Sequence, residues 1–367
     1  MERKRNGIDA GILISSLLLL GLGIVFVYSS SFALAQQRFG GADFFLGRQL
    51  IRALLGLIAL TVFINVDYHA LGKASHIGYI AAVVLLVYVL LLPESQAING
   101  AKRWVRIGFL RFQVSEFARI AMIILLAKQA QLKGYTIREG RVFVEQVIKI
   151  GLLCFLVVLE PDFSTAALIG VVGMALLFIS GAKVWHIAAV GVVCLPVAAM
   201  AVAFSPYRRM RLLGHLHLTE HKSDLGYQTY QALIGLGHGG IFGVGLGQGN
   251  QKLFYLPEPH TDFVFSILGE EIGFVGLLAV LGIYSFIVVR GLKIAMRAPD
   301  RMGQVMAFGI TFVLALYVIL HACVNTGLVP TTGLPLPFLS YGGMSLVFTM
   351  CSIGILLNIS SQAQIRE

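Results

Sequence analysis

An acidic segment stands at the start of a long apolar run. Although the whole chain has only 18 acidic residues, residues 256–271, LPEPHTDFVFSILGEE, contain five titratable side chains: Glu258, His260, Asp262, Glu270 and Glu271. The apolar run begins after Asp262 and continues to about residue 289. A carboxylate at a partly dry boundary is suited to act as a general base, because desolvation makes it a better proton acceptor. Asp262 is therefore the candidate base, and capping of the next helix by Asp262 or Thr261 is the structural alternative.

Two further acids lie at or inside apolar runs, Glu116 in RFQVSEFAR and Asp162 in LEPDFSTA. Ionisable residues in membrane spans are costly and mark functional sites. Each also has a structural interpretation. Glu116 lies three residues before Arg119 on one helical face, which predicts an ion pair, and Asp162 is placed to cap the helix that follows it. Glu270 and Glu271 are expected to pair with basic residues of the bundle.

Cationic residues supply the complementary charge. The segment 99–116, NGAKRWVRIGFLRFQVSE, contains Trp104, an aromatic residue typical of membrane interfaces, among four cations: Lys102, Arg103, Arg106 and Arg111. Arg48 and Arg52 are four residues apart on one face of another apolar run. Such clusters match phosphate or pyrophosphate, to which arginine makes bidentate contacts. Anchoring to lipid head groups is the alternative.

Other chemistry finds no support in the sequence. No phosphate-binding loop of the GxxxxGK type, zinc-ligand spacing or nucleophile elbow is present. The four cysteines lie inside apolar runs and resemble small buried hydrophobic residues. The net charge of +10 indicates anionic lipid or a phosphate-bearing ligand rather than nucleic acid.

The composition indicates an all-α integral membrane protein that forms a single polytopic domain over residues 1–367. The chain is 57% hydrophobic and 13% charged, with a mean hydropathy of +0.84, and its apolar runs are long enough for helices and do not alternate. Ten spans are predicted: 11–32, 46–65, 76–92, 115–130, 145–160, 163–181, 183–204, 264–290, 303–328 and 340–362. Basic residues in the short loops on the side of the termini predict that both termini are cytoplasmic.

The longest connection, residues 205–263, lies between the seventh and eighth predicted spans. Tyr227, Tyr230, Leu233 and Ile234 have helical spacing, and eight glycines follow between residues 235 and 249. We expect an extracytoplasmic loop with a short amphipathic or re-entrant helix, followed by a flexible glycine-rich segment. Residues 325–343, NTGLVPTTGLPLPFLSYGG, have three prolines and no charge. Irregular backbone at membrane depth must be buried in protein or line a cavity.

Four long segments closely resemble the SEDS family (shape, elongation, division and sporulation), whose members include FtsW, RodA and SpoVE. They are GAKRWVRIGFLRFQVSEFARIA (100–121), EPDFSTA (160–166), PEPHTDFVFSILGEEIGFVG (257–276) and NTGLVPTTGLPLPFLSYGG (325–343). The resemblance extends from about residue 10 to residue 360. It implies a peptidoglycan glycosyltransferase that polymerises lipid II at the outer face of the bacterial inner membrane, for cell division or elongation.

The resemblance also implies roles for single residues. Asp262 matches the family's essential aspartate and is the expected catalytic base, which accepts the proton of an acceptor hydroxyl as undecaprenyl pyrophosphate leaves with inversion. Cations stabilise the leaving group. The residues expected to bind substrate are Arg48, Lys102, Arg103, Trp104, Glu116, Arg119, Asp162 and His260.

Partners, metals and competing functions remain open at this point. The resemblance implies a class B penicillin-binding protein as the transpeptidase partner, together with other proteins of the division or elongation complex. No cofactor is certain, although Glu116, Asp162 and Asp262 would suit a divalent cation, Mg²⁺ or Mn²⁺, if they converged. A lipid II flippase would use the same cations but needs a polar path across the bilayer. A non-catalytic scaffold of the wall-synthesis machinery would need neither Asp262 nor the cations.

Overall fold

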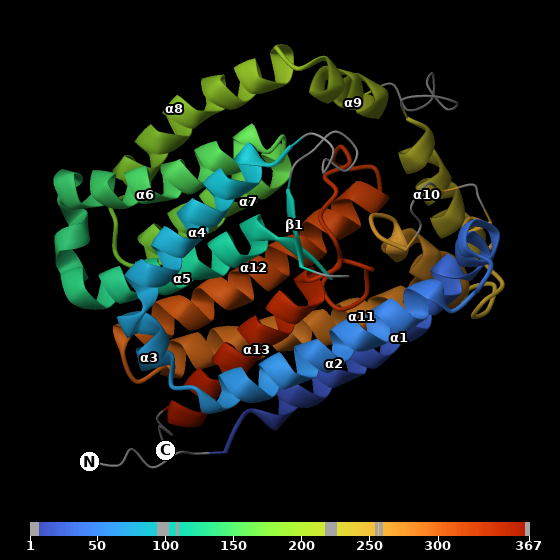
Figure 1. Cartoon of the computed structure of the whole chain (residues 1–367), viewed down its shortest axis with the longest axis horizontal. Coiled ribbons are helices and arrows are strands. Elements are labelled where there is room, and N and C mark those ends of the chain that lie inside the picture. Colours follow the sequence, from blue (N-terminus) through green and yellow to red (C-terminus); the bar gives the residue numbers. More distant parts are fainter. Residues whose placement is uncertain are drawn as a thin grey trace.

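The protein is a bundle of long helices that run roughly parallel to one axis (Figure 1). The structure, a computed structural model, describes residues 7–93, 103–107, 110–216, 226–253, 256 and 260–363. The long helices are α1 (Ala10–Phe39), α2 (Phe44–Asn65), α4 (Ser75–Leu91), α5 (Val114–Lys133), α6 (Gly140–Leu159), α7 (Phe163–Ile179), α8 (Val184–Ala203), α11 (Val264–Arg297), α12 (Arg301–Asn325) and α13 (Ser345–Gln362).

Each of the ten predicted ranges overlaps one of these helices. Seven helices of the described chain are long and apolar enough to cross a membrane: α1, α2, α6, α8, α11, α12 and α13. Two more, α4 and α7, are apolar but shorter. The prediction of a largely helical protein with many membrane-spanning helices is confirmed.

Short elements connect the long helices. They are α3 (Tyr68–Lys73), the 3₁₀ helix η2 (Gly134–Arg138), α9 (Pro206–Leu216), α10 (Tyr227–Gly239), β1 (Trp104–Ile107) and β2 (Leu110–Gln113). The two strands form an antiparallel hairpin in which Arg106 lies opposite Arg111. The all-α prediction therefore missed one small sheet, because four-residue strands are too short to show a period in the sequence.

The bundle has two ends. The start of α1, the end of α13, α3 and the α11–α12 turn lie at one end, which we call the terminus end (Figure 1). The α1–α2 turn, α10 and the segment 326–344 lie at the other, the site end. Within segment 326–344, residues 334 and 336–340 are buried, which confirms the prediction that this irregular backbone is covered by protein.

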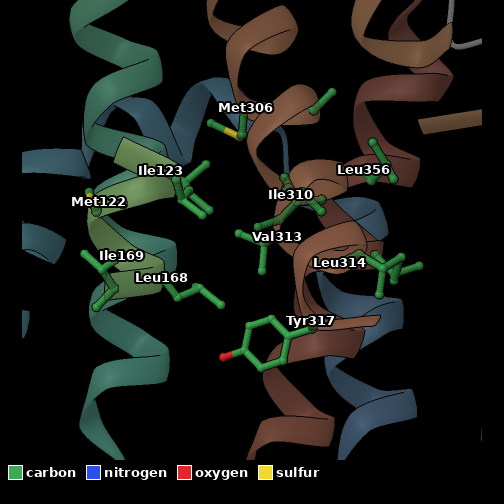
Figure 2. Close-up of a cluster of buried hydrophobic side chains, with 14 of the residues drawn as sticks. Met122, Ile123, Leu168, Ile169, Met306, Ile310, Val313, Leu314, Tyr317 and Leu356 are labelled. Carbon is green, nitrogen blue, oxygen red and sulfur yellow. The ribbon is translucent and has the colours of Figure 1, made fainter. Parts of the chain in front are cut away.

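The core lies between α5, α7, α12 and α13, where aliphatic side chains interdigitate (Figure 2). Ile123 from α5 faces Ile310 and Val313 from α12 in this layer. By contrast, α8 has no buried residue, and in Figure 1 it runs along the edge of the bundle. Its apolar side chains therefore take no part in the core formed by the other described helices.

The α10 helix packs against α11 with a face of small residues: Thr229, Ala232, Gly235 and Gly239. A Cβ atom at Gly239 would lie 2.0 Å from the Gly269 carbonyl oxygen, so the two backbones touch. Leu233 and Ile234 are exposed. A helix is present where the spacing predicted one, and the face of small residues by which it packs against α11 was not predicted.

Candidate active site

The segment that carries Asp262 lies at the site end, immediately before α11, and its backbone is held from outside. Three consecutive carbonyls accept hydrogen bonds from distant residues: His260 from the Tyr341 N–H (2.8 Å), Thr261 from the Ser340 hydroxyl (2.7 Å) and Asp262 from the Asn325 side-chain amide (3.2 Å). A Cβ atom at Gly333 would lie 3.9 Å from an Asp262 carboxylate oxygen. The carboxylate thus faces the segment 326–344 on a preorganised turn.

The alternative role of this segment, helix capping, is served by another residue. The residue at the N-cap of α11, Phe263, makes no capping hydrogen bond. The N–H of Ser266 in the first turn instead donates to the side-chain oxygen of Asn325 at 3.1 Å. Asn325 therefore joins α12 to both the Asp262 turn and the start of α11.

His260 is buried between two aromatic rings. Its ring centroid lies 4.6 Å from that of Phe45 and 5.4 Å from that of Tyr341. Burial, and then the charge of Arg38, lowers the pKa of His260 to about 4. The imidazole is therefore neutral at physiological pH and cannot supply positive charge to a substrate phosphate.

Arg48 and Arg52 approach the same aromatic group from α2. The guanidinium carbon of Arg52 lies 4.3 Å from the centroid of the Tyr341 ring, and that of Arg48 lies 4.1 Å from the Phe44 ring. Arg52 is buried, whereas Arg48 is exposed. Tyr341 contacts both His260 and Arg52, so it links the Asp262 turn to Arg52.

Glu116 and Arg119 form the predicted ion pair, with the Arg119 Nη2 atom 2.7 Å from a carboxylate oxygen of Glu116. Both side chains are buried in α5. Tyr317 of α12 completes the group: its hydroxyl donates to Glu116 at 2.9 Å and accepts from Arg119. Figure 2 shows this hydroxyl pointing away from α12. Because the pair is internally neutralised, Arg119 is not a free cation.

A small cavity adjoins this ion pair. It is lined by Arg119, Tyr317 and Pro337 together with Ser345, Thr349 and Ser352 of α13 and by aliphatic residues of α5, α12 and α13. The cavity has a mostly apolar lining between α12 and α13, into which Arg119 and the hydroxyl-bearing residues bring a few polar groups near Pro337 of segment 326–344. It satisfies the expectation that this segment is either buried or lines a cavity.

Asp162 caps α7, as its alternative interpretation predicted. Its carboxylate accepts from the Thr165 N–H at 3.2 Å and from the Gln113 amide at 3.3 Å. Arg103 lies 3.7 Å from Asp162 and donates to the carbonyls of Glu160 (3.2 Å) and Pro161 (2.6 Å). The donors of Arg103 are thus engaged in holding the α6–α7 turn to the β1–β2 hairpin.

Glu160, in the α6–α7 turn, was not recognised from the sequence. It is fully buried, and neither carboxylate oxygen has a hydrogen-bond partner among the described residues. Burial, reinforced by the charge of Asp162 and opposed by that of Arg103, raises the pKa of Glu160 to about 9. The folded protein therefore keeps this side chain protonated at neutral pH.

A pH-dependent stability follows from Glu160. The unfolded chain ionises this carboxyl above its ordinary value of 4.5, while the folded chain does not until about pH 9. The contribution of Glu160 to the stability of the folded state is therefore complete below pH 4.5 and is lost as the pH rises toward 9. We expect Glu160→Gln to increase the free energy of unfolding at pH 8 by at least about 1 kcal/mol, which is measured as a higher unfolding temperature. At pH 4.5 the substitution should have little effect. Equal shifts at both pH values, or a matching shift in the exposed control Glu139→Gln, would contradict this.

The last two of the expected site residues are Lys102 and Trp104. Lys102 lies outside the described residues. Trp104 is half-buried in β1 and pairs in register with Gln113 of β2. Gln113 in turn donates to Asp162, so the hairpin connects Trp104 to the α6–α7 turn.

The three acids do not fit a shared divalent cation. Within the described ranges, no group of three or more His, Cys, Asp or Glu side chains is close enough to hold a metal ion. Glu116 is occupied by Arg119 and Tyr317, and Asp162 is occupied by the α7 N-terminus and Gln113. We assign no step to a metal.

The glycine-rich segment after α10 is fixed to α11 by two buried carboxylates. Glu270 accepts from the N–H groups of Asn250 (2.9 Å) and Gln251 (3.1 Å) and lies 3.0 Å from His238 Nδ1. Glu271 pairs with Lys252 at 2.7 Å and accepts from Ser29 of α1 at 2.6 Å. Both acids pair with basic residues, as expected, but the partners come from α10 and the loop rather than from other spans.

Three residues on one face of α12 were missed in the sequence. Tyr317, His321 and Asn325 are spaced four apart; they contact the Glu116–Arg119 pair, the Leu334 carbonyl and the Asp262 turn respectively. This face therefore joins the two groups of candidate residues. Polar side chains repeated every fourth position in an apolar helix were the signal available.

Comparison with known proteins assigns the family. The profile of the FtsW, RodA and SpoVE family, described as cell cycle proteins, matches residues 10–365. The chain is 38% identical over 365 residues to a probable peptidoglycan glycosyltransferase FtsW of Geobacter sp. (strain M18), covering 98% of both chains. It is 38% identical over 361 residues to stage V sporulation protein E of Bacillus subtilis (strain 168), covering 98% of this chain and 99% of that protein.

Solved structures agree with the sequence comparison. A chain from a study of how a peptidoglycan synthase complex coordinates polymerization and crosslinking superposes with a TM-score of 0.80 at 27% identity, covering 96% of this chain and 97% of that chain. Thermus thermophilus RodA, a rod shape determining protein, gives a TM-score of 0.73 at 26% identity, with 96% of each chain covered. The chain therefore belongs to the SEDS family, the family of FtsW, RodA and SpoVE, and is a multi-pass membrane protein.

Proposed function

We propose that this protein is a peptidoglycan glycosyltransferase that polymerises lipid II at the outer face of the bacterial inner membrane. The relatives named as FtsW glycosyltransferases cover nearly the whole chain, which supports the reaction class. The observation that carries the proposal is the rigid Asp262 turn, three of whose carbonyls are held by α12 and segment 326–344. A base must be preorganised to contribute to catalysis.

In the proposed mechanism, Asp262 accepts the proton from the sugar hydroxyl of the acceptor as this oxygen attacks the anomeric carbon of the donor. The bond from that carbon to the diphosphate oxygen breaks, and undecaprenyl diphosphate leaves with inversion. Arginine donors stabilise the negative charge that develops on the departing diphosphate. Neutral His260 and Tyr341 support the turn that carries the base.

We propose ten membrane-spanning helices with both termini in the cytoplasm and the site end outside. Lys133, Arg138 and Arg141 lie at the connection between α5 and α6. Arg297 and Arg301 flank the turn between α11 and α12. Both connections are at the terminus end. Excess Lys and Arg in short loops marks the cytoplasmic side. This orientation leaves Asp262 at the extracytoplasmic surface, where the sugars of lipid II are located.

Flippase and scaffold functions are the alternatives. Transport of lipid II would require a polar path across the bilayer, whereas the core between α5, α7, α12 and α13 is lined by aliphatic side chains (Figure 2). A scaffold would not require a held carboxylate. The geometry favours surface chemistry over both.

The test is polymerisation of labelled lipid II by the purified full chain, analysed on a gel. We propose a class B penicillin-binding protein as the partner, since a structural relative comes from a study of a peptidoglycan synthase complex. The partner should carry an inactivated transpeptidase site, so that only glycan chains are detected. We expect long chains, and faster turnover with the partner than with the chain alone at the same concentration. If no glycan forms under either condition while lipid II crosses liposome membranes, the flippase function replaces this proposal.

A further inference from the structure

Two buried polar side chains hold the backbone on either side of Asp262. Asn325, the last residue of α12, is fully buried, and Ser340 of segment 326–344 is only 3% exposed. Asn325 donates to the carbonyl of Asp262 itself, and Ser340 donates to the carbonyl of Thr261, the residue before it. The two side chains therefore act on the same short stretch of backbone from two different elements of the fold.

The amide of Asn325 has a single orientation because all of its polar atoms are engaged. Its nitrogen donates to the carbonyls of Asp262 (3.2 Å) and of His321 (2.9 Å), one turn earlier in α12. Its oxygen accepts from the N–H of Ser266 at 3.1 Å. Reversing the amide would exchange donor and acceptor and break all of these bonds. The bond to His321 fixes the side chain to its own helix, with its other N–H directed at Asp262.

The hydroxyl of Ser340 is directed in a similar way. It accepts from the N–H of Leu336 at 2.9 Å and donates to Thr261 at 2.7 Å. A hydroxyl rotates to suit its partners, so the N–H that occupies one lone pair leaves the proton directed at the turn. The N–H of the next residue, Tyr341, donates to His260 at 2.8 Å. Consecutive residues of the segment thus supply donors to consecutive carbonyls of the turn.

These bonds set the position of the Asp262 carboxylate, because an aspartate side chain is short. Only its χ1 and χ2 torsions separate the carboxylate from the backbone, so a shift of the flanking peptide units also shifts the proton acceptor. A general base must lie within hydrogen-bond reach of the hydroxyl that it deprotonates. A misplacement of about 1 Å can lower a rate about 100-fold. Side chains that fix these peptide units should therefore affect the rate more than the affinity.

We propose that Asn325 and Ser340 are positioning residues of the glycosyl transfer, which hold the Asp262 carboxylate at the acceptor hydroxyl through the backbone of its turn. This inference rests on the proposed function for the role of Asp262 as the base. A purely structural interpretation would assign Asn325 to the cap of α11 and Ser340 to the packing of segment 326–344. The two interpretations differ in what changes when one bond to the turn is lost.

Ser266 provides a matched control for Ser340. Its hydroxyl, which is also buried, donates to the carbonyl of Ala232 at 2.6 Å and so holds α10 rather than the Asp262 turn. Ser340→Ala and Ser266→Ala each remove one short hydrogen bond from a buried serine to a backbone carbonyl. The loss of equivalent bonds should lower the unfolding temperature by comparable amounts. A difference in rate between the two variants therefore reports the position of the turn and not the stability of the fold.

The test is the initial rate of lipid II polymerisation by the full chain with its partner, measured over a range of lipid II concentrations. We expect Ser340→Ala to lower kcat by at least about tenfold. KM should stay within about twofold of wild type, because the lost bond contributes to the transition state and not to substrate binding. Ser266→Ala should stay within about twofold of wild type in both constants.

Asn325→Asp separates the two roles of the amide. It keeps an oxygen for the Ser266 N–H at the start of α11, but it places a second oxygen opposite the Asp262 and His321 carbonyls, where the nitrogen donated. The cap is retained while the turn loses its donor. We expect the loss in kcat to be at least as large as that of Ser340→Ala, with KM again within about twofold of wild type.

Two results would overturn the assignment. Equal kcat values in Ser340→Ala and Ser266→Ala would show that the bond to the turn does no more than a bond elsewhere. A loss confined to KM in Ser340→Ala and Asn325→Asp would assign both residues to substrate binding. If the wild-type chain makes no glycan, the proposed function fails and the positioning role fails with it. If the wild type polymerises lipid II and only the comparison of the serines fails, the proposed function stands without the positioning role.

Discussion

Replacement of Asp262 by asparagine is expected to lower the rate of lipid II polymerisation by at least about 100-fold, the usual contribution of a general base. Asparagine has nearly the same shape, and the Asp262 carbonyl would still accept from Asn325. The turn should therefore stay in place while the proton acceptor is lost. The measurement is the initial rate of glycan formation in the presence of the partner, with unfolding temperature recorded in parallel.

The matched control is Asp43→Asn, the same chemical change at the same end of the bundle. Asp43 is exposed, and its side chain makes no capping bond to α2. We expect it to keep wild-type activity. An Asp262→Asn variant that retains more than half of the wild-type rate would move the base to another residue. Equal loss in both variants would indicate a general effect of charge at this surface.

Loss of Lys252 is expected to cause the largest loss of stability among single side-chain changes considered. Its side chain is 1% exposed and pairs with Glu271, which is fully buried. Lys252→Met would leave the Glu271 charge buried without its counter-ion, at a cost of about 3 to 5 kcal/mol. The unfolding temperature in detergent should decrease accordingly.

A surface pair with nearly the same geometry provides the control for this prediction. Lys149 lies 2.8 Å from Glu145, whose side chain is 49% exposed, compared with 2.7 Å for the buried pair. Lys149→Met should cost no more than about 1 kcal/mol. Adding Glu271→Leu to Lys252→Met should restore part of the lost stability, because no buried charge then remains. If the two lysine variants unfold at the same temperature, burial is not what makes the Lys252 pair important.

Local patterns in the sequence predicted the local structure. The i, i+3 spacing of Glu116 and Arg119 predicted their ion pair, and the position of Asp162 before an apolar run predicted a helix cap. Runs of apolar residues predicted the ranges of the long helices because a membrane span requires length and composition alone. These features depend on residues that are close in the chain.

Contacts between distant segments could not be predicted in this way. Tyr317 is 201 residues from Glu116, and Ser29 is 242 residues from Glu271, so no spacing rule connects them. The packing face of α10 was missed because its residues are small, and small residues allow close backbone approach without a hydrophobic pattern. The glycine-rich segment was expected to be flexible for the same reason, whereas its N–H groups bind α11.

The break in α11 at Gly273 has a consequence for how the protein enters the membrane. Gly273 has a φ of 67°, and the interrupted helix is completed by the segment 240–245 through four hydrogen bonds: Val244 N–H to Glu270, Gly245 N–H to Glu271, Phe274 N–H to Gly240 and Val275 N–H to Ile241. A helix that inserts alone would leave these backbone groups unpaired in lipid. Since residues 240–245 are synthesised first, they are already available when α11 emerges. The two segments therefore form a single unit of insertion, and a chain cut between them would lack a stable α11.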